Sequence, residues 1–218
     1  MNGFTLWTVL QYLAQGLGWT LCLSLLAFVF GAAAGVLVLL ARIAPSPWWR
    51  GLACGFIEFF QGTPLLMQLF MVFFGLSLLG GDVSPWTAAA CCLTVYSAAY
   101  LAEIWRGCVE AVERGQWEAA ASLALSRGEV LRHVILPQAL RLAVTPTVGF
   151  SVQIVKGTAV TSIIGMTELT KTGSVLANAT FQPFTVFGLV ALGYFLLCYP
   201  LSRLAHHLER KLNVLAAH

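Results

Sequence analysis

Charge is scarce in this sequence. Only 10% of the 218 residues are Asp, Glu, Lys or Arg, whereas an ordinary soluble domain carries roughly a quarter. Hydrophobic residues make up 59% of the chain, and the mean hydropathy is +0.83. A sequence with so few charges and such long apolar stretches predicts an integral membrane protein, and it leaves no room for a sizeable soluble domain.

Several chemical signatures are also absent. The chain has no phosphate-binding loop of the form G-x-x-x-x-G-K-[ST], so we expect it neither to bind nor to hydrolyse ATP itself. No Lys or Arg precedes Arg42, so the basic start of a cleavable signal peptide is missing and the first apolar helix should be retained. The six cysteines lie mostly in apolar runs without metal-ligand spacing, and the scattered basic residues do not indicate nucleic acid.

Five apolar stretches are long enough to cross a bilayer, for which about 20 residues are needed. They cover residues 17–41, 52–79, 85–105, 142–164 and 184–204. We therefore predict an all-α polytopic membrane protein with about five transmembrane helices, in which residues 1–218 form a single transmembrane domain. The pairs Gly31/Gly35 and Gly51/Gly55 have the small-xxx-small spacing that lets helices approach closely.

The basic residues predict the orientation. Most of them follow the first, third and fifth stretches, which places the N-terminus outside and the C-terminus in the cytoplasm. Lys171 is then outside, and Lys156 lies within the membrane. The polar segment 107–141 becomes cytoplasmic, and residues 166–182 become an outer loop with some helix at 166–172, to which we assign no chemistry. The basic residues of the inner side are Arg42, Arg50, Arg106, Arg114, Arg127, Arg132, Arg141, Arg203, Arg210 and Lys211.

The polar segment 107–141 has the pattern of two short helices. Four alanines among the seven residues from Glu118 favour a helix that ends near Leu125. Ser126, followed three residues later by Glu129, is a capping box for a second helix, which Pro137 should interrupt. By periodicity alone, this hairpin either rests on lipid headgroups or displays a docking surface. At the start of the segment, Glu103 and Arg106 are spaced to form an ion pair.

Several segments, taken together and in this order, resemble one family. E-A-A-A-S-L-A from Glu118, with I-L-P up to Pro137, is similar to the EAA loop of ABC-importer permeases. The other matching segments are E-F-F-Q-G-T-P-L-L-M-Q from Glu58, A-Y-L-A-E-I-W-R from Ala99, R-G-Q-W-E-A-A from Arg114, L-P-Q-A-L-R from Leu136 and K-G-T-A-V from Lys156. They resemble the permeases for polar amino acids, the group serving histidine, arginine, glutamine, glutamate, cystine and opines.

The resemblance implies a type I ABC-importer permease fold in the bacterial inner membrane. It also implies four kinds of partner: two ATPase subunits, a second identical or homologous permease, an extracytoplasmic amino-acid-binding protein and the lipid bilayer. ATP and Mg²⁺ would be held by the ATPase, with no cofactor on this chain. The first short helix of segment 107–141 would fit a cleft on the ATPase, through Gly115, Gln116, Trp117, Glu118, Ala119, Ala120, Leu123, Ala124 and Leu125.

Polar residues interrupt the second and fourth apolar stretches. An ionisable side chain in the hydrocarbon core costs about 2.5–3.5 kcal/mol, so it usually faces a cavity or a partner. Glu58 and Lys156 either pair with each other or line a polar route for a zwitterionic substrate, and we favour the route. Pro64 and Gly157 would break the helices there and free backbone groups to face it. The residues expected along the route are Glu58, Gln61, Thr63, Gln153, Lys156 and Thr158.

Three segments depart from the family pattern. Ala124 replaces the usual glycine, and a non-glycine residue in a left-handed turn costs about 1–2 kcal/mol, which predicts a turn of different shape. Gln61 replaces the arginine before G-T-P. Gly157 and Ala159 stand where K-D-T-S-L has a carboxylate and a hydroxyl. These changes bear on which amino acid is carried.

Two other function classes are compatible with a polytopic chain. A membrane-embedded enzyme would need a nucleophile with a base, or a metal cluster, at membrane depth. The four histidines, His133, His206, His207 and His218, instead lie on the expected cytoplasmic side or in the tail. An ion-coupled transporter acting alone would usually contain inverted internal repeats, which we do not detect.

Overall fold

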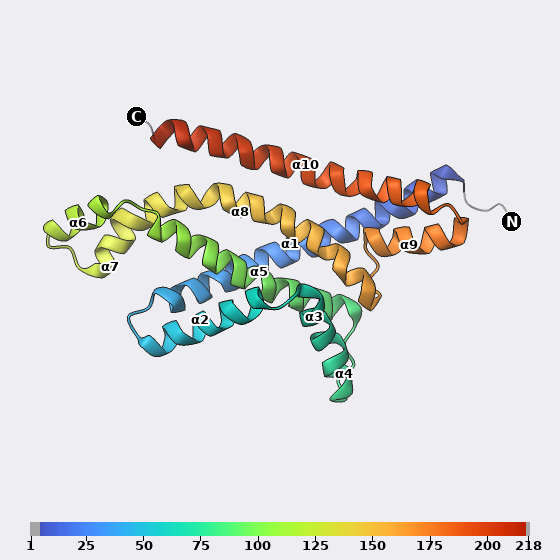
Figure 1. Cartoon of the computed structure of the whole chain (residues 1–218), viewed down its shortest axis with the longest axis horizontal. Helices are drawn as coiled ribbons and strands as arrows, with labels where there is room; N and C mark the ends of the chain where they lie inside the picture. Colours follow the sequence, from blue (N-terminus) through green and yellow to red (C-terminus); the bar gives the residue numbers. More distant parts are fainter. Residues whose placement is uncertain (1–4, 217–218) are drawn as a thin grey trace.

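The structure, a computed structural model, describes residues 5–216, with side chains through Lys211, and every regular element in that range is helical. Figure 1 shows an elongated bundle whose longest helices run along one axis, with the start of α1 and the end of α10 toward opposite ends of it. These helices are α1 (Leu6–Ile43), α5 (Pro85–Glu110), α8 (Leu136–Thr158) and α10 (Pro183–Ala216).

The second apolar stretch is a broken helix. It begins as α2 (Pro47–Gly62), becomes extended at Thr63 and Pro64, and continues as α3 (Leu65–Phe70). Pro64 cannot donate a backbone hydrogen bond, and its ring favours an extended residue before it, which explains φ −113° and ψ 141° at Thr63. A π-helical turn (Met71–Gly75) and α4 (Leu76–Leu78) complete the second half, which is bent by 104° from the first. The helix break predicted at Pro64 is confirmed.

The prediction of about five spans is confirmed. By length and composition, four helices can cross a membrane, and the bent pair of half-helices brings the number to five within the described residues. The helical stretch that contains the fourth span, Arg127–Ile164, begins well before the predicted apolar residues. It consists of α7 (Arg127–Glu129), a π-helical turn (Val130–Ile135), α8 and a 3₁₀ turn (Ala159–Ile164).

The helix breaks predicted at Pro137 and Gly157 do not occur. Pro137 does not end a helix, because it lies in the first turn of α8, where its missing N–H group is tolerated after the π-helical turn. Gly157 does not break α8 either. The helix ends one residue later, at Thr158, and the chain tightens into the 3₁₀ turn.

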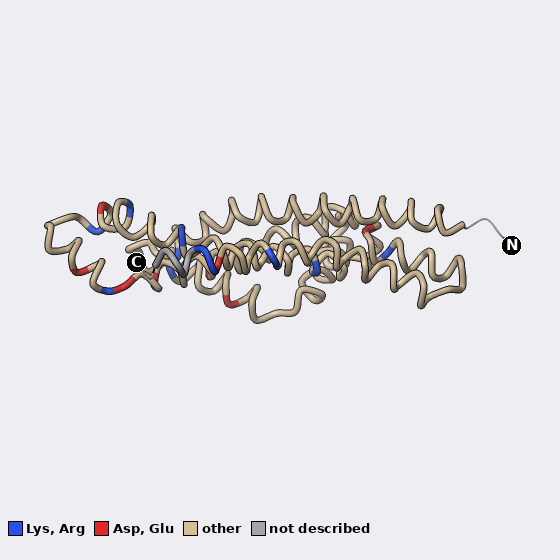
Figure 2. Tube along the Cα trace, turned by 90° about the horizontal axis from the view of Figure 1, so that it is seen from above, with Lys and Arg blue, Asp and Glu red and all other residues tan. Residues whose placement is uncertain are grey.

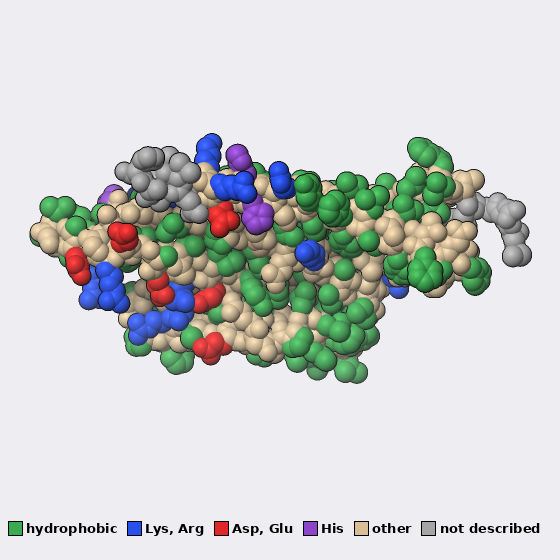
Figure 3. All heavy atoms as spheres, turned by 45° about the horizontal axis from the view of Figure 1, so that its top comes forward, with side chains coloured by type: hydrophobic (Ala, Val, Ile, Leu, Met, Phe, Trp, Pro, Cys, Tyr) green, Lys and Arg blue, Asp and Glu red, His purple; other side chains and the backbone are tan. Residues whose placement is uncertain are grey.

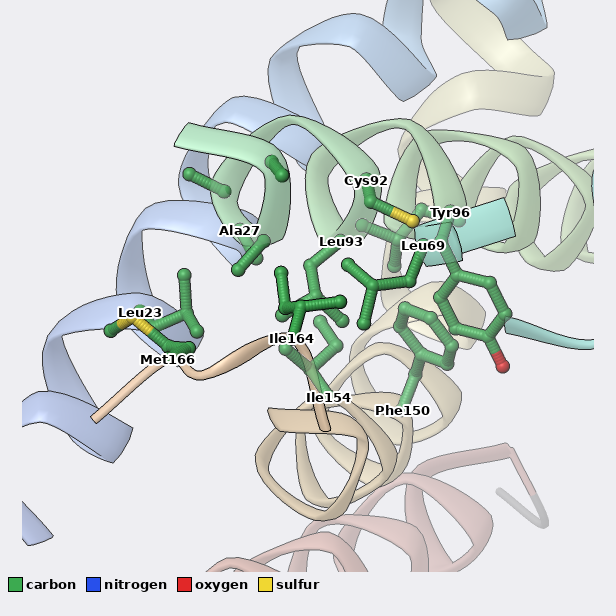
Figure 4. Packing of buried hydrophobic residues seen from close by; sticks show 14 residues of the cluster. Leu23, Ala27, Leu69, Cys92, Leu93, Tyr96, Phe150, Ile154, Ile164 and Met166 are labelled. Carbon is green, nitrogen blue, oxygen red and sulfur yellow. The ribbon is translucent and has the colours of Figure 1, made fainter. Parts of the chain in front are cut away.

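Helices α1 and α5 approach closely at the predicted glycines. A Cβ atom on Gly31 would collide with Ser97 Cβ, and one on Gly35 would lie 3.2 Å from the Ala98 carbonyl oxygen. In contrast, Gly51 and Gly55 face open space within this chain. Beside the contact lies the main core (Figure 4), which includes Leu23, Ala27, Leu69, Leu93, Phe150, Ile154 and Ile164.

The segment between α8 and α10 is more regular than predicted. Instead of a short helix at 166–172, it contains α9 (Leu169–Thr180), packed against α1 and α10. Gly165, at φ 89°, ends the preceding 3₁₀ turn in a left-handed conformation. Glu168 then caps α9 by accepting a 2.7 Å hydrogen bond from the Lys171 N–H group.

Charged side chains gather at one end of the molecule. Figure 2 shows most of them around the end that carries α6 (Arg114–Ser122) and α7. Hydrophobic side chains dominate the other half of the face in Figure 3. The charged end therefore suits water and the remainder suits lipid. Which side of the membrane each end faces, and the single-domain organisation, stay predictions.

Candidate functional site

A cavity lies where the broken span meets α5. Its volume is about 190 Å³, and its lining side chains carry no charge. Both halves of the broken span contribute to the wall, so the bend helps to shape the cavity. The lining residues are Phe59, Phe60, Thr63, Met67, Gln68, Met71, Val72, Cys91, Cys92 and Val95.

Two polar residues of the cavity wall are bonded to each other. Gln68 is only 6% exposed, and its Nε2 atom donates to Thr63 Oγ1 at 2.9 Å. Thr63 Oγ1 in turn donates to the Phe59 carbonyl oxygen at 2.7 Å. The sequence marked Thr63 as a candidate and missed Gln68, although Gln68 is the last residue of the family-like segment from Glu58. It gave no separate signal because a glutamine in an apolar run resembles any other polar interruption.

Glu58 and Gln61 belong to α2, but they do not lie on the side of the helix that lines the cavity. Three residues apart, they share one side of the helix, and neither lines the cavity. Glu58 is exposed and accepts a 3.0 Å hydrogen bond from the Cys54 thiol. The predicted pathway residues of the second stretch are therefore divided between two sides of one helix.

Three predicted pathway residues lie on α8 in two environments. Gln153 and Lys156 are exposed, and Gln153 Nε2 donates to the Tyr96 hydroxyl at 3.2 Å. Thr158 is fully buried and donates to the Val155 carbonyl oxygen at 2.7 Å. Its hydroxyl is therefore used inside the helix.

The structure separates Glu58 from Lys156. No ion pair joins them within this chain, although the side chains of both are described. The alternative in which the two charges neutralise each other is therefore not seen in the chain by itself.

An aromatic stack that the sequence did not reveal holds Gln153 beside α5. The ring centroids of Tyr96 and Tyr100 are 4.4 Å apart, and Tyr100 stacks on Phe150 at 5.6 Å. Tyr96 and Phe150 are nearly buried. The residues come from α5 and α8, and only the three-dimensional structure brings them together. The stack fixes the position of the Gln153 partner, Tyr96.

The segment between α5 and α8 forms a small tip with its own core. Trp117 and Ala120 on one side of α6 pack with apolar residues of α5 and the start of the fourth span. The Gln138 Nε2 atom donates to Gln116 Oε1 at 3.3 Å and links α8 to α6. Leu123 remains 74% exposed at the tip. The exposed members of the predicted ATPase-contact set are Gly115, Gln116, Glu118, Ala119, Leu123 and Ala124.

The turn after α6 is tight. The helix ends at Ser122, earlier than the predicted Leu125. Ala124 has φ 57°, so this alanine takes the left-handed conformation that a glycine would take, and the expected change of turn shape is not seen. The predicted capping box is confirmed: Glu129 N–H donates to Ser126 Oγ at 3.4 Å, and Ser126 N–H donates to Glu129 Oε2 at 2.9 Å.

Ion pairs mark the junction between α5 and the tip. Arg106 pairs with Glu103 at 2.5 Å, as predicted, and also with Glu110 on the next turn. Among the described residues, no three His, Cys, Asp or Glu side chains are grouped as they would be around a metal ion.

A buried carboxyl group outside this site was missed by the sequence. Glu168 is fully buried, and its Oε2 atom accepts a 2.6 Å hydrogen bond from the Tyr194 hydroxyl. Thr20 of α1 lies 3.5 Å from the same oxygen and accepts the Leu169 N–H bond at 3.2 Å. Glu168 was overlooked because it sits in a segment rich in Thr, Gly, Ser and Asn, a composition typical of an exposed loop.

Comparison with known proteins gives one consistent result. Residues 27–214 match the family described as binding-protein-dependent transport system inner membrane component. The probable amino-acid ABC transporter permease protein YckA of Bacillus subtilis is 34% identical over 200 residues, covering 92% of this chain and 88% of that protein. The glutamine transport system permease protein GlnP of Escherichia coli K12 is 34% identical over 212 residues, covering 96% of this chain and 97% of that protein.

A solved structure of an amino acid ABC transporter is also similar to this chain. The crystal structure of an amino acid ABC transporter with histidines contains a chain that is 31% identical to this one. It superposes with a TM-score of 0.91 and covers 97% of this chain and 100% of that chain. The bent second span and the long fourth span thus occur in a fold already known from a transporter.

Proposed function

The chain belongs to the binding-protein-dependent transport system inner membrane components, and we propose that, as the permease subunit of an ATP-binding-cassette importer, it forms part of the passage for a polar amino acid. The observation that carries the proposal is the broken second span. Its two halves and α5 line a half-open cavity with a mostly apolar wall, and discontinuous spanning helices are where transporters commonly place substrate sites. Their freed backbone groups are tolerated at membrane depth only beside a cavity or protein.

We propose distinct contributions for the predicted pathway residues. Thr63 would act at the cavity, whereas Glu58 and Gln61 would act from the other side of α2. Gln153 and Lys156 project from α8 and would meet the polar ends of a zwitterion. Thr158 would support α8 through its buried hydrogen bond to Val155. Partial support comes from exposure, because an exposed charge on a membrane helix needs a cavity or a partner.

ATP hydrolysis is proposed to occur on a partner subunit that holds ATP and Mg²⁺ and docks on segment 107–141. The contact would use Gly115, Gln116, Trp117, Glu118, Ala119, Ala120, Leu123, Ala124 and Leu125. The supporting observation is that Gln116, Glu118 and Leu123 are exposed together at the charged end of the molecule, where a soluble partner could reach them. Two such ATPases, a second identical or homologous permease and an extracytoplasmic binding protein would complete the importer.

Co-purification from the native membrane in mild detergent, with mass spectrometry of the retained proteins, tests the assembly. We expect an ATPase subunit and either a second copy of this chain or a related permease. Reconstitution of the recovered complex with its binding protein should give amino-acid uptake that depends on ATP. Recovery of this chain alone, under conditions that keep other complexes intact, would contradict the proposal.

The docking surface is tested by charge reversal at Glu118. Because Glu118 is exposed on α6, Glu118→Lys should leave the fold intact while it releases the ATPase or separates ATP hydrolysis from uptake. Glu209→Lys, on an exposed part of α10, is the matched control. Normal ATPase retention and normal uptake in Glu118→Lys would remove α6 from the proposed interface.

The pathway assignment is tested by removing its two charges. Glu58→Ala and Lys156→Ala should each reduce uptake while leaving the ATPase bound, because neither residue lies in the docking segment. Unchanged uptake in both variants would end the case for a polar route past these side chains.

A further inference from the structure

The break in the second span leaves carbonyl oxygens at the end of α2 without their usual donors, and those of Phe60 and Thr63 are two of them. In a continuous helix, the Phe60 carbonyl would accept from the N–H group of residue 64, but residue 64 is proline. The Thr63 carbonyl would accept from Met67, but the Met67 N–H group donates to Pro64 instead, at 2.9 Å. An unpaired carbonyl at membrane depth is costly, so both oxygens need another donor.

The Gln68 side chain supplies that donor. Its Nε2 atom lies 2.9 Å from the Phe60 carbonyl oxygen and 3.0 Å from the Thr63 carbonyl oxygen. The same atom lies 2.9 Å from Thr63 Oγ1. A flipped amide would place Oε1 against two carbonyl oxygens, so the hydrogen-bond pattern fixes the orientation of the group. One buried amide thus connects the start of α3 to the end of α2.

The same connection sets the shape of the cavity. Phe59 and Phe60 of the wall come from α2, whereas Met67 and Met71 come from beyond the bend. The distance between these parts of the wall depends on the angle between the two half-helices, which is 104°. Gln68 lies in the wall and also holds the joint, so it can set the cavity width without any charge of its own.

We propose that Gln68 is the positioning residue of the broken span: its carboxamide holds α2 and α3 at the angle that gives the cavity the shape required by the transported amino acid. The assignment of the cavity to the substrate rests on the proposed function, whereas the holding of the joint does not. Loss of the amide donor then loosens the joint, widens the range of cavity shapes and weakens substrate binding more than it slows turnover.

The test compares Gln68→Met with Ser77→Ala in the complete co-purified importer, reconstituted in lipid nanodiscs. Methionine keeps nearly the length and volume of glutamine and removes the donor. Ser77 donates to the Phe73 carbonyl oxygen at 2.8 Å within the same half-span, so its variant removes one local hydrogen bond without touching the joint. Amide hydrogen exchange is followed over residues 59–70, and uptake is measured in proteoliposomes as KM and kcat.

We expect exchange over residues 59–70 to be about tenfold faster in Gln68→Met, because the hydrogen bonds of the amide across the joint are lost, and unchanged in Ser77→Ala. KM should rise by a similar factor while kcat per assembled complex stays near the original value. A purely structural loss would lower the amount of complex and leave KM alone. If Gln68→Met exchanged as slowly as the unaltered protein, the proposal that Gln68 holds the joint would be overturned. Faster exchange with an unchanged KM would overturn the proposal that the joint sets the substrate fit.

A second variant keeps the joint testable if Gln68→Met fails to assemble. Thr63→Val removes one of the three acceptors, and it should speed the exchange of residues 59–70 by a smaller factor; no effect would again reject the joint. If the unaltered complex shows no ATP-dependent amino-acid uptake, the proposed function fails, while the exchange experiment still decides whether Gln68 holds the bend.

Discussion

The Tyr194 hydroxyl and the Glu168 carboxyl group are hydrogen bonded at 2.6 Å in a buried position. The bond joins α10 to the start of α9, and the second carboxyl oxygen accepts from the Lys171 N–H group at 2.7 Å. Thr20 adds α1 to the same group of contacts. A single acidic side chain therefore organises three helices at the end of the molecule that carries α9.

Replacement of Glu168 by alanine should destabilise the protein strongly. It would leave the Lys171 N–H group without its acceptor and the Tyr194 hydroxyl with Thr170 Oγ1 as its remaining partner, and a polar group left unpaired in the interior costs about 1–3 kcal/mol. Glu168→Gln keeps one acceptor oxygen and should lose less. Thermal unfolding in detergent ranks the stabilities of the two variants. Glu113 is exposed, so Glu113→Ala is a control that should leave the melting temperature unchanged. Equal melting temperatures for Glu168→Ala and the original chain would show that these contacts do not hold the helices.

A methyl group on Gly31 should push α1 away from α5. Its Cβ atom would collide with Ser97 Cβ and lie 3.1 Å from the Thr94 carbonyl oxygen, and overpacking of this kind costs about 1–3 kcal/mol. Gly18 is on the same helix, but a Cβ atom there would have nothing within 4 Å, so Gly18→Ala is the matched control. Gly18→Ala should be neutral or stabilising by about 1 kcal/mol. Chemical unfolding of both variants checks the prediction, which fails if Gly31→Ala is as stable as Gly18→Ala.

Glycine should be preferred to the natural residue at Ala124. The left-handed φ of 57° costs an alanine about 1–2 kcal/mol in the folded state. Glycine avoids this cost, but its greater freedom in the unfolded state offsets about 0.4–1 kcal/mol of the gain. Ala124→Gly should therefore stabilise the turn. Ala121→Gly, inside α6, should weaken the helix by about 1 kcal/mol. Hydrogen exchange over residues 114–130 compares them, and slower exchange in Ala121→Gly than in Ala124→Gly would contradict the expectation.

The capping box at α7, in the water-facing tip, should weaken in acid. Hydrogen bonds from the Ser126 side chain and backbone hold the pKa of Glu129 below its usual value of about 4.3. A group with a lowered folded pKa contributes stability above its unfolded pKa and loses it as the pH falls through the folded value. The exchange rates of residues 126–130 in the original chain should therefore approach those of Glu129→Gln as the pH falls through the lowered pKa of Glu129. A constant difference between the two at all acidic pH values would exclude the carboxylate as the cause.

Periodicity and residue chemistry predicted the spans but not all of their limits. The break at Pro64 follows from a missing N–H group and is therefore visible in the sequence. Pro137 has the same chemistry and no such effect, because a π-helical turn precedes it and places it at a helix start. Whether a proline ends a helix or begins one depends on neighbouring turns that local composition does not determine.

The site was predictable only where a residue carries unusual chemistry for its surroundings. Glu58 and Lys156 stood out as charges in apolar runs, and Thr63 stood out beside a proline. Gln68 and Glu168 owe their roles to partners such as the Phe60 carbonyl, eight residues from Gln68, and the Tyr194 hydroxyl, twenty-six residues from Glu168. No spacing rule for a single helix contains those contacts, so they became visible only once the helices were packed.

The contact at Gly31 has a mechanical consequence. It holds α1 directly against α5, and α5 leads straight into the tip that carries α6 (Figure 1). Helix α1 has 38 residues and is therefore about 57 Å long. Because the contact leaves no gap to absorb displacement, we expect α1 and α5 to move together, so that a push on the tip would also displace the far end of α1.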